Sequence, residues 1–416
     1  MNYITIEFQL FAEGLNTNVT TQESLSAEMK TFYDMTLIDE ASPKLVHEQF
    51  GQKRPIPQGK GKSVEFRKFS ALPKALTPIT EGVTPAGGSL EVTTVTAEVE
   101  QYGYYITQSD MLELTAIDNT IVQATKLLGQ QAGITLDTIV RNIINAGTNV
   151  AYAPKIANGA ETAVEHRYDL DETCNISVKL VEKEAANMRA HNVPSIDGFY
   201  VMIVHPYVVN DLRNDERWID AHKYTNADTI YNGEAGRIGG VRFVESSEAK
   251  IFKGGKIAGT RDYLTVSSVS GTSITIKESL TSAEQAMFDG TKPTPIIIGG
   301  KPAEVLIATS ATQLGLMASV SGIQANDKIY LAGGGKDNRA VFSCLLLGAD
   351  AYGVTEISGG GLQTIVKQKG SGGTSDPLDQ RSTIGWKSTR TAEILLPQYI
   401  RRIEVCAKDF NPDSEN

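Results

Sequence analysis

A glycine-rich stretch with basic residues, Gly59-Lys60-Gly61-Lys62-Ser63, is the first candidate for chemistry, because loops of this composition can cradle phosphate groups. The phosphate-binding motif G-x-x-x-x-G-K needs a further glycine at the place where this chain has Ile56. The motif also leads into a helix, whereas the residues after Lys62 favour a strand. A basic turn is the favoured interpretation, and no nucleotide site is predicted.

The histidines and cysteines offer neither a metal site nor a nucleophile. No two histidines have the close spacing of a zinc-binding pair on a helix; they are His47, His166, His191, His205 and His222. The cysteines lie far apart with no Cys-x-x-Cys pair, which indicates buried thiols; they are Cys174, Cys344 and Cys406. His205 follows a predicted buried strand, where a packed or capping histidine is commoner than a general base. Because nucleophile-elbow and dinucleotide motifs are also missing, we predict no enzyme activity, no cofactor and no bound metal.

The charged residues between 52 and 106 are separated by sign along the chain, which suggests that they form ion pairs at a contact. Basic residues gather in the first half of this segment and acidic residues in the second. One interpretation is a solvated hairpin that pairs its own charges, and such exposed pairs add little stability. The other is that these charges meet opposite charges on neighbouring subunits and fix the register of a repeated contact. The candidate interface residues are Arg54, Lys62, Arg67, Lys68, Glu81, Glu91, Glu98 and Glu100.

Two predicted strands carry these charges, Ser63 to Phe69 and the longer Leu90 to Tyr105. Neither strand has a clean apolar face, since Phe66 shares its side with Lys68. A two-stranded ribbon of this polarity is only marginally stable alone. We therefore expect it to need a partner surface, and another copy of the chain is the favoured source.

A long helix from Asn119 to about Asn145 is predicted next, with Asp118 as its N-cap and Gly147 at its end. At about 1.5 Å per residue it spans roughly 40 Å, which is long for a globular domain. Gly129 and Gly133 fall one turn apart and weaken the helix, so we expect them to admit close approach of another element.

The remainder of the chain favours a domain of mixed helices and strands that is interrupted by a β-rich module. A short helical pattern at Leu25 to Ile38 lies in the leader. Residues 169 to 250 favour helices at Thr173 to Ala190 and Val208 to Arg213, and strands at Phe199 to Val204 and Val241 to Glu245. Residues 252 to 339 show short alternating runs separated by Gly, Ser and Thr, typical of an inserted β-rich module. The later predicted strands are Val341 to Leu347, Ala392 to Leu396 and Ile400 to Val405.

Composition excludes several classes of protein. The chain has 416 residues, 21% charged and 41% hydrophobic, which fits two or three packed units of a folded protein. A net charge of -10 argues against a protein that grips nucleic acid, because such proteins need a basic surface. No apolar run reaches membrane-spanning length. Met1 to Phe11 lacks the features of a signal peptide, so we expect a protein made and kept in a cytoplasm.

Several short strings, taken in order, resemble those of a known family. The strings are Glu65-Phe66-Arg67, Thr77 to Pro85, Gln101-Tyr102-Gly103, His205-Pro206-Tyr207, Gly348 to Gly353 and Gly385-Trp386-Lys387. They are similar to strings in major capsid proteins of tailed double-stranded-DNA bacteriophages, in the coat-protein family typified by the N-four coliphage. The similarity spans residues of about 50–250 and 341–406.

The resemblance implies an α+β, HK97-like (Hong Kong 97) capsid fold with named parts. These are an N-terminal arm at 1–46, an extended β-hairpin loop at 52–106, and a peripheral domain at 107–168 with its spine helix at 119–145. The axial domain would comprise 169–250 and 341–365, and 366–416 would return to the peripheral domain and the C-terminus. The segment 252–339 departs from the compact family pattern, so we expect an inserted β-rich domain that faces outward.

The resemblance also implies a function. It implies a major capsid protein that self-assembles as pentamers and hexamers into the icosahedral head of the virion, in the host bacterial cytoplasm. The implied partners are copies of the chain, with decoration, portal and scaffold proteins, and DNA that is enclosed without tight specific binding; no membrane is involved. The alternative is an encapsulin-like cellular shell. A β-rich surface adhesin, suggested by 252–339, is less favoured because no signal peptide is found.

Overall fold

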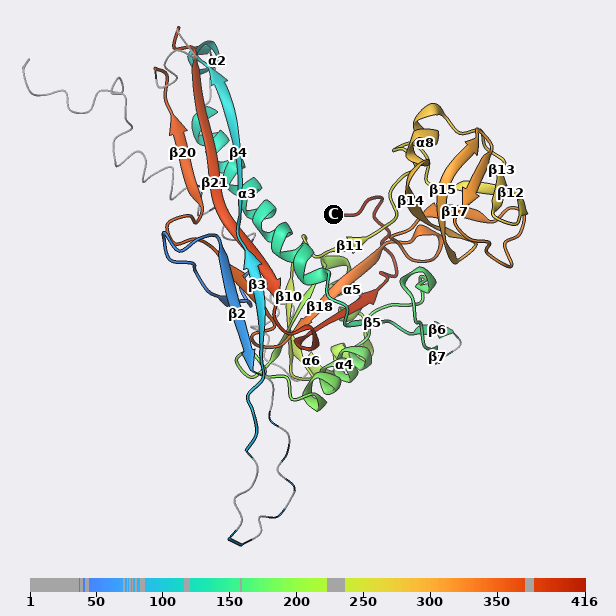
Figure 1. Cartoon of the computed structure of the whole chain (residues 1–416), viewed down its shortest axis with the longest axis horizontal. Helices are drawn as coiled ribbons and strands as arrows, with labels where there is room; N and C mark the ends of the chain where they lie inside the picture. The colour runs from blue at the N-terminus through green and yellow to red at the C-terminus, as the bar shows by residue number, and fades with distance from the viewer. Residues whose placement is uncertain are drawn as a thin grey trace, which may run out of the picture.

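The computed structural model shows an elongated subunit with a central body, a long arm, a projecting ribbon and a separate barrel (Figure 1). It describes residues 45–69, 87–115, 120–157, 159–222, 236–370 and 378–416, with single residues and short pieces at 37, 40–41, 72, 74, 76, 78 and 81–82. The predicted helix at Leu25 to Ile38 and the predicted cap at Asp118 lie outside this part of the chain, apart from Leu37.

The central body is a seven-stranded mixed sheet covered by helices. Its strand order is β5 (Val150–Tyr152), β22 (Ile400–Val405), β18 (Val341–Leu347), β8 (Tyr200–Val204), β10 (Val241–Glu245) and β9 (Arg237–Ile238), with β11 (Ile251–Phe252) also paired to β18. Every residue of β8 and β18 is buried, as expected of apolar strands covered on both faces. The covering helices are α4 (Val178–Ala190), α5 (Pro206–Arg213) and α6 (Glu216–His222).

The long arm combines a second sheet with the predicted long helix, which runs from Thr120 to Asn145 as α3. The sheet order is β1 (Gln52–Lys53), β19 (Tyr352–Thr355), β21 (Arg381–Ile394) and β20 (Gln363–Lys367), and β4 (Glu100–Ser109) also pairs with β21. The short helix α2 (Asp110–Thr115) follows β4 at the far end of the arm (Figure 1). Gly129 does admit a close neighbour, because a Cβ there would lie 2.7 Å from the Leu37 carbonyl oxygen.

The projecting ribbon pairs β2 (Ser63–Phe69) with β3 (Val92–Glu98) in antiparallel register. The prediction of one continuous strand from Leu90 to Tyr105 is wrong. The strand breaks at Val99, whose N–H donates to the Lys62 carbonyl at 2.8 Å, and β4 then leaves the ribbon to pair with β21. Both halves mix polar residues such as Thr and Glu with apolar ones, so the sequence carries no sign of the change of partner.

The inserted β-rich module predicted between the body strands is a closed barrel. Its strands, in order around the barrel, are β12 (Leu264–Ser270), β13 (Ser273–Ile276), β16 (Gln313–Leu316), β15 (Lys301–Ser310), β14 (Asp289–Ile298) and β17 (Lys328–Leu331). Helix α8 (Ser282–Met287) starts at a capping box between Thr281 and Glu284. The barrel has its own apolar core, which includes Leu264, Ile274 and Phe288.

Smaller elements complete the chain. A hairpin of β6 (Lys155–Ala157) and β7 (Ala160–Thr162) lies beside the body, and single turns of 3-10 helix are η2 (Arg167–Asp169), η3 (Lys336–Asn338) and η5 (Pro397–Tyr399). The strand predicted at Ala392 to Leu396 is only the end of the fourteen-residue β21. Within residues 366–416, β21 belongs to the arm sheet, whereas β22 belongs to the body sheet.

Candidate subunit interface

The base of the ribbon is tied to the arm sheet by its own chain. β1 pairs in parallel with β19, where Gln52 and Lys53 lie opposite Gly353 and Val354. The chain then stays on this edge, because the Ile56 N–H donates to the Glu356 carbonyl at 2.7 Å and the Thr355 hydroxyl donates to the Arg54 carbonyl at 2.6 Å. The ribbon therefore starts from a fixed support.

The apolar side chains of the ribbon lie on one face, which they share with Lys68 and Thr93 as the predicted alternation requires. Phe66 lies opposite Val95, and Val64 lies opposite Ala97, so the four side chains share one side. Phe66 is 4% exposed and Ala97 is 2% exposed. The phenyl ring of Phe66 packs on Gly353, where a Cβ would come within 2.5 Å of the ring. The ring has this space only because residue 353 is glycine.

A buried polar network fixes the chain just before β1. The His47 Nδ1 lies 2.7 Å from the Asp137 carboxylate on α3, and both side chains are fully buried. Glu48 pairs with Arg390 on β21, and Arg390 also reaches Glu356 at 3.2 Å. Buried charges are retained where they are paired in this way. The sequence did not reveal the role of His47, because its partner lies 90 positions further along the chain.

We call the described residues between 72 and 91 the tip; they include large apolar side chains that are open to solvent. Leu76 is 83% exposed, Leu90 is 66% exposed and Leu72 is 61% exposed. Glu81 and Glu91 are also exposed. Residues 87–91, which lead back into β3, extend away from the rest of the subunit beyond the free end of β2 and β3 (Figure 1). Large apolar side chains that are exposed together commonly mark a surface that contacts another protein.

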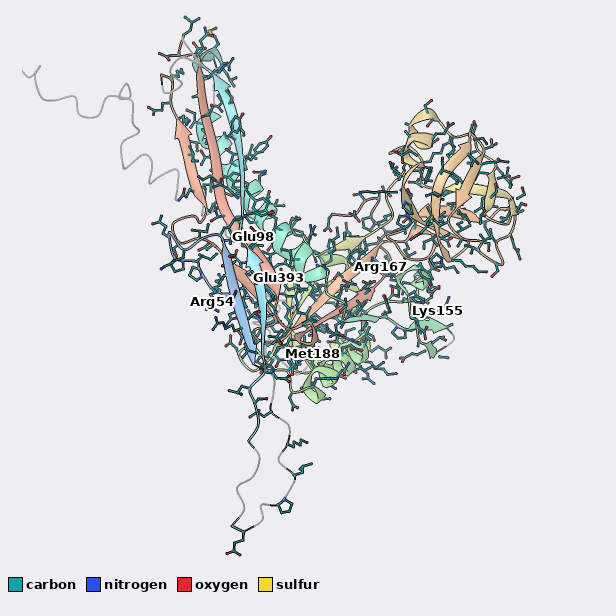
Figure 2. All side chains as sticks on the ribbon, in the orientation of Figure 1. Arg54, Glu98, Lys155, Arg167, Met188 and Glu393 are labelled. Atoms are coloured by element: carbon teal, nitrogen blue, oxygen red, sulfur yellow. The ribbon has the colours of Figure 1, made fainter. Side chains whose placement is uncertain are left out.

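The predicted interface charges divide into two groups. Near the base, the Lys62 ammonium pairs with Glu98 across the ribbon, and this hydrogen bond raises the pKa of Lys62. The Arg54 Nη1 donates to the Glu65 carbonyl at 3.2 Å, and Arg67 lies 3.9 Å from the Glu65 carboxylate. Figure 2 labels Arg54 and Glu98 beside the ribbon, well away from its free end. These residues have contacts within their own chain.

In the second group, Glu100 is the one residue with a described side chain that has a contact within its own chain. Glu81 and Glu91 lie on the exposed tip and its return. Glu100 accepts a hydrogen bond from the Tyr102 hydroxyl at 2.8 Å, while burial is the main cause that raises the pKa of Tyr102. The side chain of Lys68 lies outside the described part of the structure. The structure thus leaves the acidic tip, rather than the basic strand, as the end that lacks partners of its own among the described residues.

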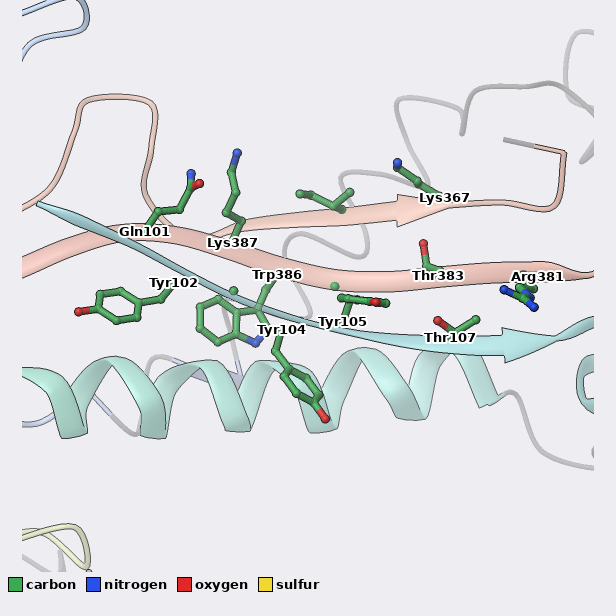
Figure 3. A pocket seen from close by; sticks show the side chains of 13 residues that line it. Gln101, Tyr102, Tyr104, Tyr105, Thr107, Lys367, Arg381, Thr383, Trp386 and Lys387 are labelled. Atoms are coloured by element: carbon green, nitrogen blue, oxygen red, sulfur yellow. The ribbon is translucent and has the colours of Figure 1, made fainter. Parts of the chain in front are cut away.

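A concave surface on the arm offers a complementary partner. It lies over the outer side of β4, β21 and β20, with a cavity volume of about 720 Å³ (Figure 3). Its floor is opened by Gly103 and Gly385, because a Cβ on Gly385 would lie 2.7 Å from the Cβ of Tyr105. We call this surface the receiving face; its apolar and basic residues are Tyr105, Ile365, Lys367, Arg381 and Lys387.

The two sides of this sheet differ in burial. On the inner side, Trp386 is 3% exposed and its indole N–H donates to the Gln131 side chain of α3 at 2.6 Å. On the outer side, Tyr105 is 70% exposed and Ile365 is 41% exposed. Figure 3 shows Lys367 and Lys387 pointing away from α3, on the receiving face. In the sequence, Gly385-Trp386-Lys387 indicated only a resemblance to a family, and nothing there pointed to the receiving face that these residues line.

The candidate residues for catalysis and phosphate binding occupy a helix cap, a buried site and a tight turn. Burial lowers the pKa of His205 to about 4, and its Nδ1 accepts from the Tyr207 N–H at 3.2 Å at the start of α5. Burial raises the pKa of the Cys406 thiol to about 12. Gly59 and Gly61 have φ values of 78° and 91°, in a turn that leads directly into β2. A histidine cap, inert thiols and a glycine turn account for these motifs.

Among the described residues, no three or more His, Cys, Asp or Glu side chains are grouped as a metal ion would require. No described helix is both long enough and apolar enough to cross a membrane.

Comparison with known proteins supplies the family. A family model described as phage capsid protein matches residues 106–369. No curated protein sequence matches the chain. The capsid of Ralstonia phage GP4 is similar in structure, with a TM-score of 0.52 and 12% identity over 99% of this chain and 100% of that chain. The capsid of the cyanophage P-SCSP1u has a TM-score of 0.49 and 12% identity over 97% and 98% of the two chains. The likeness to the GP4 capsid confirms the HK97-like capsid fold, with the barrel as its β-rich insertion.

Proposed function

The chain belongs to the phage capsid protein family and is a major capsid protein of an icosahedral bacteriophage shell; we propose that its copies are joined by the ribbon tip of one subunit and the receiving face of another. The observation that carries this proposal is the contrast within one ribbon. Its base packs on its own chain, whereas its tip presents Leu72, Leu76 and Leu90 to solvent.

Chemical complementarity supports the pairing of tip and receiving face. The tip combines exposed leucines with Glu81 and Glu91, and Lys74 adds a positive charge. The receiving face combines the exposed Tyr105 and Ile365 with lysines at 367 and 387. Burial of the leucines supplies affinity, at about 25 cal/mol per Å² of apolar surface removed from water, and the charges fix orientation.

Each part of the chain has a place in the assembled shell. Copies form pentamers and hexamers, the region 1–46 serves as an N-terminal arm and 52–106 as the extended loop, and the insertion faces outward. Residues 107–168 belong to the peripheral domain, and residues 169–250 with 341–365 belong to the axial domain. Portal, scaffold and decoration proteins act beside the shell during assembly in the host cytoplasm. The shell encloses double-stranded DNA without gripping it, because a net charge of -10 repels phosphates.

The test places charge in the apolar tip. Leu76→Asp with Leu90→Asp is expected to abolish closed particles in negative-stain microscopy, since two carboxylates would have to be buried at each contact. The unfolding free energy of the subunit is expected to change by less than about 0.5 kcal/mol, because both positions are exposed. Leu306→Asp on the barrel, 36% exposed, is the matched control and should assemble. Normal particles from the double variant would refute the proposed contact.

Particle content tests the enclosed cargo separately. Particles from infected cells are expected to hold double-stranded DNA that nuclease reaches only after the shell is opened. Particles that enclose a protein and no nucleic acid would instead favour a cellular compartment built on the same fold.

A further inference from the structure

The barrel is joined to the body by two chain segments that are bonded to each other. We call them the stem; they are residues 250–256 on the way out and residues 332–340 on the way back. Asn338 joins them, because its side-chain oxygen accepts from the Gly254 N–H at 2.7 Å and its amide donates to the Gly254 carbonyl at 2.9 Å. A Cβ on Gly333 would lie 2.9 Å from the Lys253 carbonyl oxygen, so the two segments touch.

Residues 407–416, which we call the strap, cross the returning segment of the stem. The Arg339 Nη2 donates to the carbonyls of Ala407 and Lys408, each at 2.9 Å. Further along, the Asn411 side-chain oxygen accepts from the Ala340 N–H at 2.9 Å. The strap therefore bonds the backbone of the returning segment just before β18.

The same strap then crosses the outgoing segment. The Lys253 ammonium donates to the Pro412 carbonyl at 2.5 Å. The Asn416 side chain makes two bonds, accepting from the Ile251 N–H at 2.9 Å and donating to the Ala249 carbonyl at 2.9 Å. One short stretch of chain thus holds both segments of the stem.

Each end of the strap is fixed to the body. Near its start, the Lys408 N–H donates to the Asp211 carboxylate at 2.8 Å, and Phe410 stacks on Tyr207 with ring centroids 4.2 Å apart. Near its end, Arg141 of α3, which is 1% exposed, donates to the Asn416 carbonyl at 3.0 Å. Figure 1 shows the end of the chain between α3 and the barrel.

We propose that the strap sets the angle of the barrel relative to the body, and that release of the strap lets the barrel swing as a folded unit. The apolar cores of barrel and body share no residue, so apolar packing does not fix this angle. The stem is held to the body by β11, which pairs with β18, by the Lys336 N–H bond to the Leu170 carbonyl at 2.8 Å and by the Arg339–Glu172 pair. The strap adds polar bonds between exposed chain segments, which open and close more readily than a buried core. The strap is a conformational device that positions the outermost module of the subunit, independently of the tip contact.

Distance measurement on the full-length subunit tests this proposal. The native cysteines are buried, so spin labels attach selectively to Lys126→Cys on α3 and Gln313→Cys on the barrel, both exposed positions. The parent is expected to give one narrow distance distribution. Asn411→Ala with Asn416→Ala removes three side-chain bonds to the stem and its neighbour Ala249, and it should broaden the distribution.

Two controls make the result decisive. Ser414→Ala alters the strap at an exposed position whose side chain makes no hydrogen bond to the stem among the described residues, and it should keep the narrow distribution. In the double variant, the Ile251 and Ala340 amides should exchange with solvent about tenfold faster, while barrel-core amides such as Ile274 keep their rates. A distribution as narrow as that of the parent, in a folded double variant with accelerated exchange, would overturn the proposal.

Discussion

The two ends of the ribbon are built from similar residues and are treated oppositely by the fold. At the base, Phe66 is 4% exposed against Gly353 of its own chain. At the tip, Leu76 is 83% exposed and has no described neighbour of its own subunit to cover it. An apolar side chain at the base therefore stabilises the monomer, and one at the tip gains its burial only when another molecule arrives. Subunit stability and assembly are separable within one hairpin.

The largest effect that this comparison predicts is at the base. Phe66→Ala is expected to lower the unfolding free energy by about 3–5 kcal/mol, because it removes a buried aromatic ring and leaves a cavity. Urea unfolding of the unassembled subunit measures this loss. Leu72→Ala, at 61% exposure, should change it by less than about 0.5 kcal/mol. Equal losses for the two variants would erase the distinction between base and tip.

Acid is expected to lower the unfolding free energy of the subunit through a buried histidine of the body, and the exposed tip has no part in this effect. The pKa of His205 is lowered to about 4 in the folded state, against about 6.5 when unfolded. Between these two pH values, His205 binds a proton in the unfolded chain but not in the folded one. The contribution of His205 to the unfolding free energy is therefore fully present above pH 6.5 and is lost as the pH falls toward 4. A shift of this size corresponds to a loss of about 3 kcal/mol.

His205→Asn isolates that contribution, because asparagine keeps a capping side chain at the start of α5. Urea unfolding at pH 7 and pH 4 is expected to show a smaller loss for the variant than for the parent. The same acid sensitivity in both proteins would mean that His205 is not the group responsible.

The smallest effect is expected from exchanging the paired charges of the ribbon. Lys62→Glu with Glu98→Lys restores the pair across the strands, so the unfolding midpoint and the particle yield should both stay at the parental values. If these two charges instead contacted a neighbouring subunit, the exchange would set like charges against each other at every copy. A collapse of particle yield with an unchanged midpoint would move this pair from the base group to the interface.

The sequence predicted those elements whose periodicity is local. The strands Ser63–Phe69, Val241–Glu245 and Val341–Leu347 agree with prediction at both ends, and the long helix ends at Asn145 as predicted. The body strands and the helix have a local apolar pattern, so their burial can be read from the order of residues alone, whereas Ser63–Phe69 was predicted from its β-favouring residues between turn signals. The inserted β-rich module was predicted in the same way.

What the sequence did not predict depends on partners that are distant along the chain. Val99 ends one strand because β21 takes over the pairing, and the polar outer side of β21 hid most of that strand. Phe66 is buried because Gly353 leaves room for its ring. The receiving face was missed for a similar reason, since Tyr105 and Ile365 become neighbours only when β4 and β20 flank β21.

Site-specific cross-linking between copies tests the account most directly. Subunits carrying Leu76→Cys are mixed with subunits carrying Ile365→Cys, assembled, and treated with a short bis-maleimide reagent; the native cysteines are buried and do not compete. A covalent dimer formed only in assembled mixtures is the predicted result. Particles that assemble without any cross-link, or a doubly substituted monomer that links within itself, would contradict the account.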